Sequence, residues 1–592
     1  MKRSWVSLVA VAALAVGFSG CSDSSDGKSA SNPNAPLKGV DTVLFEGIAT
    51  PATDAQKNTL QSSRTITVNG EEQAVSFTTL MATGHADNGE VFGLVKDIND
   101  NPIKFEDGSN YICNGTNDGV GSGLDYSSIL QKNGKIYMVN QFECQVGAMY
   151  KFELDQDKET GALSPKADTL EFISQKDEFG GFVHCAGQTT PWNSHLGSEE
   201  YESDARSIEG VNGATGSKYY DETVKFWGGD FSKMSPYFYG WTPEVQIMSD
   251  GSANYMKHYA MGRFSHELAY VMPDKKTVYQ TDDGANVALF VFVADKAEDL
   301  SAGTLYAGKF EQTSAGNAGA FNISWIDLGH ATNDEIRDYV ANMTVFSDIF
   351  ETADANANFT CPTGFTSINA SAGHECLKVK DGMEKVASRL ETRRYAAMKG
   401  ATTEFRKMEG FTYDEANKKA YLAMSNVARG MADGYSASKN TTKYDDGGNN
   451  DLRVPENICG AVYSLSIGAD MMATDMMGTV EGMELAEADA YGNTCHADMI
   501  SQPDNVAMLP GTSILMIGED TSKHTNNVIW AYDTMTGALT RTLTTPVGAE
   551  TTSPFWYADI NGWGYMTAVT QHPKVDGAKE SSVGVIGNIK FK

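Results

Sequence analysis

Short runs of apolar and β-branched residues recur along the chain from about Asp41 to the C-terminus, separated by turns rich in Gly, Asp and Asn. Their lengths of about four to eight residues are typical of β-strands. Examples are residues 135–142 (KIYMVNQF), 288–295 (ALFVFVAD) and 514–519 (ILMIGE). The pattern predicts an all-β protein.

Two of these runs lead into related turns, in residues 150–165 (YKFELDQDKETGALSP) and 529–542 (IWAYDTMTGALTRT). A faint repeat of this kind favours the four-stranded blades of a β-propeller over residues 41–592, although two β-sandwiches would also supply many short strands. The pattern does not give the number of blades. One interruption, at about residues 330–405, contains the helical segment MEKVASRLETRRYAAM, and we interpret it as a partly helical insertion instead of a second domain.

The N-terminus has the layout of a secretory signal. Lys2 and Arg3 precede an uncharged apolar run that ends at Phe18, and Cys21 follows Ser19 and Gly20. We expect a signal peptide at residues 1–20, lipid attachment at Cys21 and a flexible tether at residues 21–40, with simple cleavage near Gly20 as the alternative. The sequence thus predicts a periplasmic or cell-surface bacterial lipoprotein that touches the membrane only through its anchor.

The chain has eight cysteines, and an exported protein can keep disulfides. Cys361 and Cys376 bracket a short loop and form the first expected pair. Proximity in sequence suggests two more, Cys113 with Cys144 and Cys459 with Cys495. With Cys21 assigned to lipid, Cys185 is left over.

Acidic residues outnumber basic ones, 77 to 46, giving a net charge of −31. This charge argues against a nucleic-acid backbone as partner, because like charges repel. It suits a protein that binds Ca²⁺ through oxygen ligands. An anionic substrate would then need a locally cationic site, which a bound metal supplies. We expect a monomer.

Candidate chemistry begins at residues 184–192 (HCAGQTTPW), which are followed by Glu199 and Glu200. Neighbouring carboxylates suppress a thiolate, whereas a metal ion stabilises one. A buried inert cysteine is the alternative for Cys185. Further carboxylates lie at turns or strand ends downstream, where propeller loops converge: Glu267, Asp282, Asp283, Glu409 and Asp504. Together with Cys185 they predict a mixed oxygen and sulfur metal site.

Several motifs resemble those of the PhoX-type alkaline phosphatases, in the family's order, over roughly residues 135–573. The matching segments are CAGQTTPW with Glu199 and Glu200, Tyr239-Gly240-Trp241 with Glu244, GRFSHE at 262–267, ETRRYAAMKGATTEFRKME at 391–409, and Gln571-His572-Pro573. The resemblance implies a propeller that holds ferric iron and calcium and hydrolyses a small phosphate monoester. It places Cys185, Glu267, Glu409 and Asp504 among the core metal ligands, and Glu199, Glu200 and Asp282 at calcium or neighbouring positions.

The sequence also departs from the family pattern. Lys407 stands where the family has an arginine, so we expect Lys407, or Arg406 beside it, to assist the phosphate. Asn505 replaces a glycine, which asparagine can do where the backbone is left-handed. Gly284 replaces an acidic residue. These changes leave two alternatives open, a phosphodiesterase on the same metal cluster and a non-catalytic calcium-binding propeller.

Overall fold

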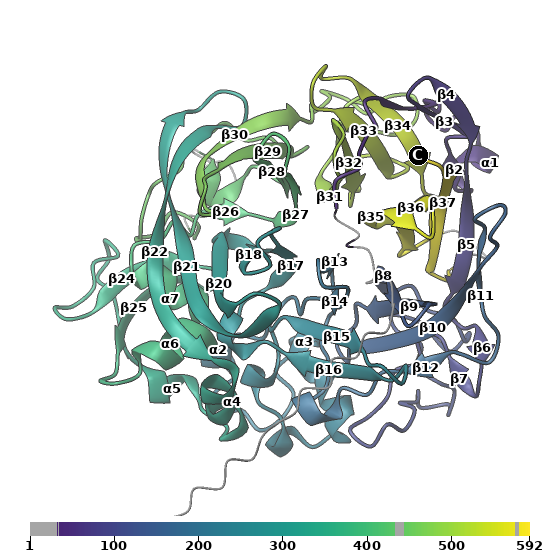
Figure 1. Ribbon diagram of the computed structural model, residues 1–592. Coiled ribbons are helices and arrows are strands. Elements are labelled where there is room, and N and C mark those ends of the chain that lie inside the picture. Colours follow the sequence, from purple (N-terminus) through teal and green to yellow (C-terminus); the bar gives the residue numbers. More distant parts are fainter. Residues whose placement is uncertain (1–31, 33–34, 433–442, 575–578, 592) are drawn as a thin grey trace, which may run out of the picture.

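The computed structural model describes residues 32, 35–432, 443–574 and 579–591. Within them the strands form antiparallel sheets arranged around a central axis, as Figure 1 shows. Six four-stranded units can be followed in the strand order, so the predicted all-β propeller fold is confirmed and has six blades. In these parts of the chain no helix is long and apolar enough to cross a membrane.

The blades are numbered here in the order of their innermost strands. Blade 1 comprises β8 (Leu124–Lys132), β9 (Lys135–Phe142), β10 (Ala148–Gln156) and β11 (Leu163–Pro165). Blade 2 comprises β13 (Gln188–Thr189), β14 (His195–Leu196), β15 (Pro243–Ile247) and β16 (Ala253–Lys257). Blade 3 comprises β17 (His266–Val271), β18 (Thr277–Asp282), β20 (Phe290–Lys296) and β21 (Asp299–Ser314).

Blade 4 comprises β27 (Met408–Asp414), β28 (Lys419–Met424), β29 (Ala461–Ile467) and β30 (Ala473–Glu481). Blade 5 comprises β31 (Pro503–Met508), β32 (Ile514–Glu519), β33 (Val528–Asp533) and β34 (Leu539–Thr544). Blade 6 comprises β35 (Glu550–Ile560), β36 (Trp563–Gln571), β37 (Ser582–Ile589) and β5 (Ser76–Ala82).

Blade 6 closes the ring, because its outermost strand, β5, comes from the N-terminal part of the chain and pairs with the C-terminal strand β37. Blades 3 and 4 are also joined through β22 (Ala320–Thr332), which pairs with both β21 and β30. Apolar side chains pack between neighbouring blades. Tyr279 of β18, for example, stacks on Phe411 of β27 with ring centroids 4.4 Å apart. This packing fixes the inner strands relative to one another.

The segment between β22 and β26 (Phe405–Arg406) carries most of the α-helical residues that the structure describes. It contains α4 (Asn333–Ala341), α5 (Phe346–Ile349), a sheet of β23 (Phe350–Ala353), β24 (Thr366–Ala370) and β25 (Gly373–Val379), then α6 (Glu384–Leu390) and α7 (Thr392–Met398). Helix α4 begins at a capping box, in which the side chains of Thr332 and Glu335 satisfy each other's backbone N–H groups. The partly helical insertion is therefore present.

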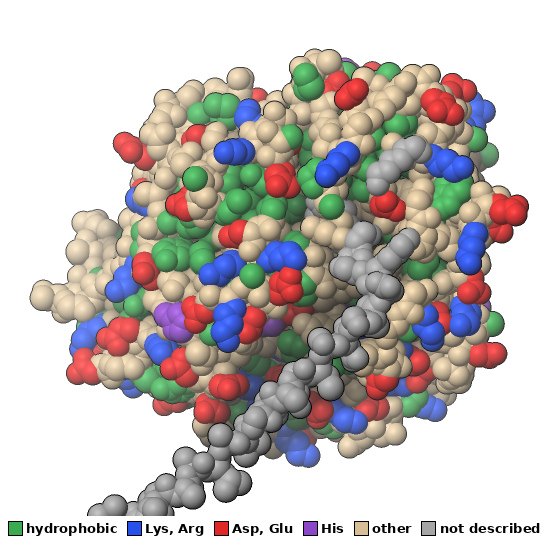
Figure 2. Space-filling model, viewed as in Figure 1, with side chains coloured by type: hydrophobic (Ala, Val, Ile, Leu, Met, Phe, Trp, Pro, Cys, Tyr) green, Lys and Arg blue, Asp and Glu red, His purple; other side chains and the backbone are tan. Residues whose placement is uncertain are grey.

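Three disulfides confirm the pairings expected from the sequence: Cys113–Cys144, Cys361–Cys376 and Cys459–Cys495. Among the described cysteines only Cys185 is free. Cys21 and the predicted signal peptide lie outside the described residues. On the face shown in Figure 2, acidic and basic side chains are interspersed, so the negative charge is not gathered there into one patch.

Candidate metal centre and active site

Four innermost strands begin in the same way. The second residue of β8, β17, β27 and β31 is a carboxylate, respectively Asp125, Glu267, Glu409 and Asp504. At each one the pairing register with the next strand shifts, so that two residues oppose one. In β27, for instance, Glu409 and Gly410 together oppose Ala423. Such β-bulges re-aim a side chain, and all four carboxylates line one cavity.

This cavity has a volume of about 770 Å³. The strand ends supply its buried carboxylates, and longer loops supply the rest of its wall. Its ionisable lining comprises Asp125, Glu143, Cys185, Glu200, Tyr201, Tyr219, Glu267, Asp283, Lys407, Glu409, Asp504, Asp520, His524, Glu550, His572 and Lys574. We call this space the metal cavity.

Potential metal ligands in the cavity form three overlapping groups: Asp125, Glu143 and Cys185; Cys185, Glu200 and Glu267; and Glu267, Glu409 and Asp504. Within each group the donor atoms lie within 4.8 Å of one another. Because Cys185 and Glu267 are each shared by two groups, the donors form one continuous cluster. Carboxylates with a single thiol suit hard cations together with iron.

The electrostatics of the cluster also fit a cation. Burial, reinforced by Glu409 and Asp504, raises the pKa of Glu267 well above its ordinary value. Burial also raises the pKa of the Cys185 thiol, and the negative charges of Glu267 and Glu200 raise it further. Burial raises the pKa of Asp125 to about 6 and of Glu143 to about 7. A multivalent cation would reverse these shifts by attracting the deprotonated forms.

Asp283 provides a further sign of a missing partner, because its buried Oδ1 makes no hydrogen bond within the described residues. Its Oδ2 accepts a hydrogen bond from the Tyr201 hydroxyl at 2.6 Å and lies 3.4 Å from Lys407 Nζ. Burial raises the pKa of Asp283, but Lys407, a hydrogen bond from Glu200 and Arg406 outweigh it and hold the pKa below its ordinary range. Asp283 therefore presents an ionised, half-satisfied carboxylate to the cavity.

Both predicted cationic residues lie beside the cluster. Lys407 Nζ is 2.9 Å from Glu409 Oε1, and the Arg406 guanidinium donates to the Gly284 carbonyl oxygen at 2.6 Å. Lys407 lines the metal cavity directly, whereas Arg406 is turned toward the backbone of Gly284. The structure thus offers Lys407 as the nearer positive charge for an anionic ligand.

Two predicted metal residues lie elsewhere. Glu199 is fully buried and is ion-paired with Lys257 at 2.7 Å, while its other oxygen accepts from the backbone N–H groups of Gly240 and Trp241. Asp282 receives two hydrogen bonds from the Arg393 Nε and one from its Nη2. Neither lines the metal cavity. Their neighbours Glu200 and Asp283 do, because adjacent residues in extended backbone point in opposite directions.

Several cavity residues were missed at the sequence level: Asp125, Glu143, Tyr201, Tyr219, Asp520, Glu550 and His572. Asp125 could have been found, since it occupies the same strand position as Glu267 and Glu409. Glu143 comes directly after β9. The sequence KIYMVNQF predicts this strand, but it does not predict the direction in which the Glu143 side chain points. Glu550 is the first residue of β35, and the other four lie in connections between strands of one blade: Tyr201 and Tyr219 between β14 and β15, Asp520 after β32 and His572 after β36. In such connections the residue pattern carries no periodic signal.

Left-handed backbone at non-glycine residues surrounds the cavity. Tyr201 (φ 52°), Lys407 (φ 50°), Gln502 (φ 45°) and His572 (φ 51°) all adopt it. Such conformations cost about 1 kcal/mol or more and concentrate at functional sites. Asn505 itself is not left-handed, and the left-handed residue nearby is Gln502, so the replacement of a glycine by Asn505 does not depend on left-handed backbone.

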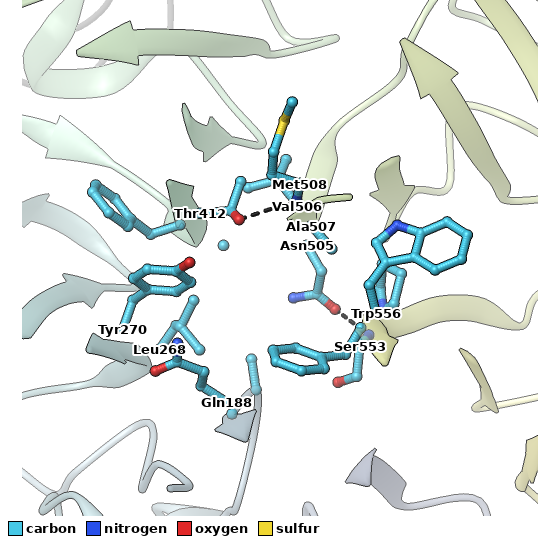
Figure 3. Close-up of a pocket in the computed structure, with 16 residues that line it drawn as sticks. Gln188, Leu268, Tyr270, Thr412, Asn505, Val506, Ala507, Met508, Ser553 and Trp556 are labelled. Carbon is cyan, nitrogen blue, oxygen red and sulfur yellow. Dashed lines mark hydrogen bonds between the residues drawn. The ribbon is translucent and has the colours of Figure 1, made fainter. Parts of the chain in front are cut away.

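Asn505 lies where the metal cavity meets a smaller pocket. It lines both that cavity and a small pocket of about 30 Å³ on the propeller axis. Figure 3 shows Asn505 pointing into this axial pocket and hydrogen-bonded to the backbone of Ser553, with Gln188, Leu268, Tyr270 and Thr412 around it. The Ser553 hydroxyl donates to Asp125 Oδ1 at 3.0 Å. The inner strands thus continue from the cluster into a packed axial core.

Comparison with known proteins agrees with this geometry. The family model described as alkaline phosphatase PhoX matches residues 159–573. The solved structure of Pseudomonas fluorescens PhoX in complex with vanadate, a transition state analogue, is similar with a TM-score of 0.58 and 16% identity, covering 93% of this chain and 98% of that one.

Other solved structures are much less similar. The parainfluenza virus 5 hemagglutinin-neuraminidase ectodomain gives a TM-score of 0.33 at 6% identity, covering 92% of this chain and 88% of that one. The Pseudomonas aeruginosa periplasmic gluconolactonase PpgL gives 0.29 at 9% identity, covering 80% and 96%. Neither value supports an argument about function. The comparison with curated proteins found no match.

The fold and the site define a six-bladed propeller enzyme whose inner strand ends carry a buried acidic cluster. The chain belongs to the PhoX alkaline phosphatase family, since the family model covers more than half of it, and it is a phosphatase.

Proposed function

We propose that this protein hydrolyses phosphate monoesters with the help of bound cations. The single observation that carries the proposal is the continuous donor cluster of Cys185 with buried carboxylates, with Lys407 at its edge. An acidic cavity alone would repel a phosphate. The proposal therefore requires cations, and the donor set favours iron near Cys185 and calcium among the carboxylates.

The chain's own residues would have three tasks. Cys185, Glu267, Glu409 and Asp504 would hold the central cations, with Glu200, Asp125, Glu143 and Asp283 beside them. When bound, such cations supply positive charge for phosphoryl oxygens and lower the pKa of a bound water. The packed inner strands would keep the donors in place, so that little reorganisation is needed during the reaction.

Lys407 would bind the phosphate. In the structure its Nζ contacts Glu409 and Asp283, two residues that also face the cluster. Cations bound there would compete for these carboxylates and leave the ammonium available to a phosphoryl oxygen. The side chain of Arg406 lies close by, with an Nη1 atom 4.0 Å from Asp283 Oδ1. The vanadate complex of the Pseudomonas fluorescens relative supports a phosphoryl-transfer site on this fold.

We also propose that the protein is exported and acts as a monomer. Three disulfides support a location outside the cytoplasm. Lipid attachment at Cys21 remains a prediction from the sequence. One observation favours the non-catalytic calcium-binding alternative, namely that Lys407 is a point charge and lacks the bidentate geometry of an arginine.

Phosphatase assays on the purified protein test the proposal. An aryl phosphate should be hydrolysed, a chelator should abolish turnover, and iron with calcium should restore it. The same assay with a phosphodiester substrate distinguishes a monoesterase from a diesterase. Absence of monoester turnover in the metal-replete protein would overturn the proposal. If the purified protein contains calcium but no iron, the non-catalytic calcium-binding alternative would be favoured.

A further inference from the structure

A second cavity, of about 360 Å³, adjoins the metal cavity. Its wall comes from the long connection between β14 and β15 and from the insertion that contains α7. Tyr201, Tyr219 and Asp283 line both spaces. We call the second space the side chamber. It has room for an organic group next to the place where a phosphate would bind.

The boundary between the two spaces is aromatic and fixed. The rings of Tyr201 and Tyr219 pack with centroids 5.0 Å apart and planes inclined by 37°. Tyr201 is held at both ends, since its backbone N–H donates to Ser265 Oγ at 2.9 Å and its hydroxyl donates to Asp283. Its left-handed backbone is a strained conformation that this loop maintains. The tyrosines thus present ring surface at the entrance of the side chamber.

The three arginines in the side chamber are already engaged by protein groups. Arg393 binds Asp282 and Glu202. Arg394 binds Glu391, Glu375 and Asp204. Every described hydrogen bond from the Arg263 guanidinium goes to a main-chain carbonyl oxygen. All three guanidinium groups that line the side chamber thus already have protein partners.

The remaining polar lining is hydroxylic. Ser203, Ser207, Ser217, Ser265 and Ser371 all border the side chamber. Ser207 and Ser217 are exposed, so the chamber opens to solvent on that side. Hydroxyl groups can both donate and accept hydrogen bonds. The lining therefore matches a neutral, hydroxylated group better than a charged one.

We propose that the side chamber binds the alcohol portion of the substrate, and that this alcohol is neutral, hydroxylated and ring-bearing, as in a sugar or cyclic polyol. The inference rests on the proposed function. Tyr201 and Tyr219 contact the apolar face of the ring, and the serines contact its hydroxyls. Its volume of about 360 Å³ is within the range of small-ligand sites.

Ser217→Trp tests the chamber by filling it. Ser217 is exposed and its side chain makes no capping hydrogen bond to α3 (Lys218–Asp221), so the substitution should not prevent folding. In the metal-loaded protein, kcat/KM for a hexose 6-phosphate divided by that for methyl phosphate should fall about tenfold. Ser249→Trp, in the exposed turn between β15 and β16, is the matched control and should leave this ratio unchanged.

Truncating the aromatic wall gives a second test. Tyr219→Ala should lower the same ratio by about threefold to tenfold, and Tyr219→Phe should retain most of it, because an aromatic contact is worth that much. Phenyl phosphate tests whether the side chamber prefers an aromatic alcohol or a hydroxylated one. If the wild-type protein favours phenyl phosphate over methyl phosphate but does not favour the hexose ester, the assignment to hydroxylated alcohols is wrong.

A binding measurement makes the test independent of turnover. The phosphonate analogue of a hexose 6-phosphate should bind more tightly than methylphosphonate in calorimetry, and Ser217→Trp should remove the difference. Equal affinities in the wild-type protein would overturn the side-chamber proposal. Failure of the proposed function looks different, because then neither phosphonate binds and methyl phosphate is not hydrolysed.

Discussion

The thiol of Cys185 lies 3.5 Å from Oε1 of Glu267, although the two residues belong to different blades and are far apart in the sequence. Cys185 precedes β13 of blade 2, and Glu267 is the second residue of β17 of blade 3. Both pKa values are raised by burial and by neighbouring carboxylates. This contact joins two groups of metal donors, so the cluster depends on the relative position of two blades.

Replacing Cys185 by alanine should remove iron from the protein. We expect phosphatase activity to fall by at least about tenfold, since even residues that only support a metal ligand cost about that much. Elemental analysis of the purified variant measures the effect, and its circular dichroism shows whether the fold is retained. A Cys185→Ala protein with full iron content and full activity would exclude the residue from the site.

Glu409 and Glu199 should respond differently to the same substitution. Glu409→Gln removes a charge from the donor cluster and should weaken metal binding while the metal-free protein gains stability. Glu199→Gln leaves Lys257 buried without its partner, which should lower the free energy of unfolding by about 3 to 5 kcal/mol. Metal content per folded molecule should stay normal in that variant.

Denaturant unfolding and metal analysis of both variants distinguish these outcomes. Adding Lys257→Met to Glu199→Gln should recover part of the lost stability, because no unpaired charge then remains buried. If the Glu199→Gln protein is fully stable but has lost metal, Glu199 takes part in metal binding after all.

The stability of the metal-free protein should decrease as pH rises. Asp125 and Glu143 have folded-state pKa values of about 6 and about 7, above their ordinary values of 3.8 and 4.5. The folded state therefore binds more protons than the unfolded state between about pH 4 and pH 7. The stability contributed by these protons is fully present below the unfolded pKa and is lost as pH rises through the folded pKa.

Between pH 4.5 and pH 8 Asp125 should contribute roughly 2 kcal/mol and Glu143 roughly 3 kcal/mol to the decrease, because one pKa unit corresponds to about 1.4 kcal/mol. Urea unfolding of the chelated protein from pH 4.5 to pH 8 measures it. The metal-loaded protein should show a much weaker dependence, since cations favour the deprotonated forms. Stability of the metal-free protein that increases over this range would contradict the account.

Lys407→Met should raise KM for a phosphate monoester by about tenfold and weaken inhibition by inorganic phosphate to a similar degree, because a charged contact is worth about 1.5 to 3 kcal/mol. Lys407→Arg should retain most activity, since it keeps the charge. Lys419→Met, in an exposed position on β28, is the control. An unchanged KM in Lys407→Met would show that another group binds the phosphate.

The sequence predicted the strands well because their apolar runs are short and bounded by turn residues. Disulfide pairing followed from proximity, and Cys185 was correctly left over. Blade number could not be predicted, since β5 closes blade 6 with a strand from the opposite end of the chain and β22 joins blades 3 and 4. Such pairings depend on tertiary packing and leave no local pattern.

The sequence predicted which segments form the candidate site more reliably than which residues of those segments line it. Glu199 and Glu200 are adjacent, as are Asp282 and Asp283, yet only the second of each pair lines the metal cavity. Direction within a segment depends on strand register and on bulges, which the sequence does not specify. Tyr219 was missed for a related reason, since a long connection between β14 and β15 brings it to the cavity.

Metal stoichiometry measured together with turnover tests the central claim most directly. Fractions of the purified protein that differ in metal loading should be analysed by mass spectrometry for iron and calcium and assayed with an aryl phosphate. The account predicts that monoesterase activity rises in proportion to the iron and calcium bound per chain. Turnover that persists in chelated protein without either metal would contradict it.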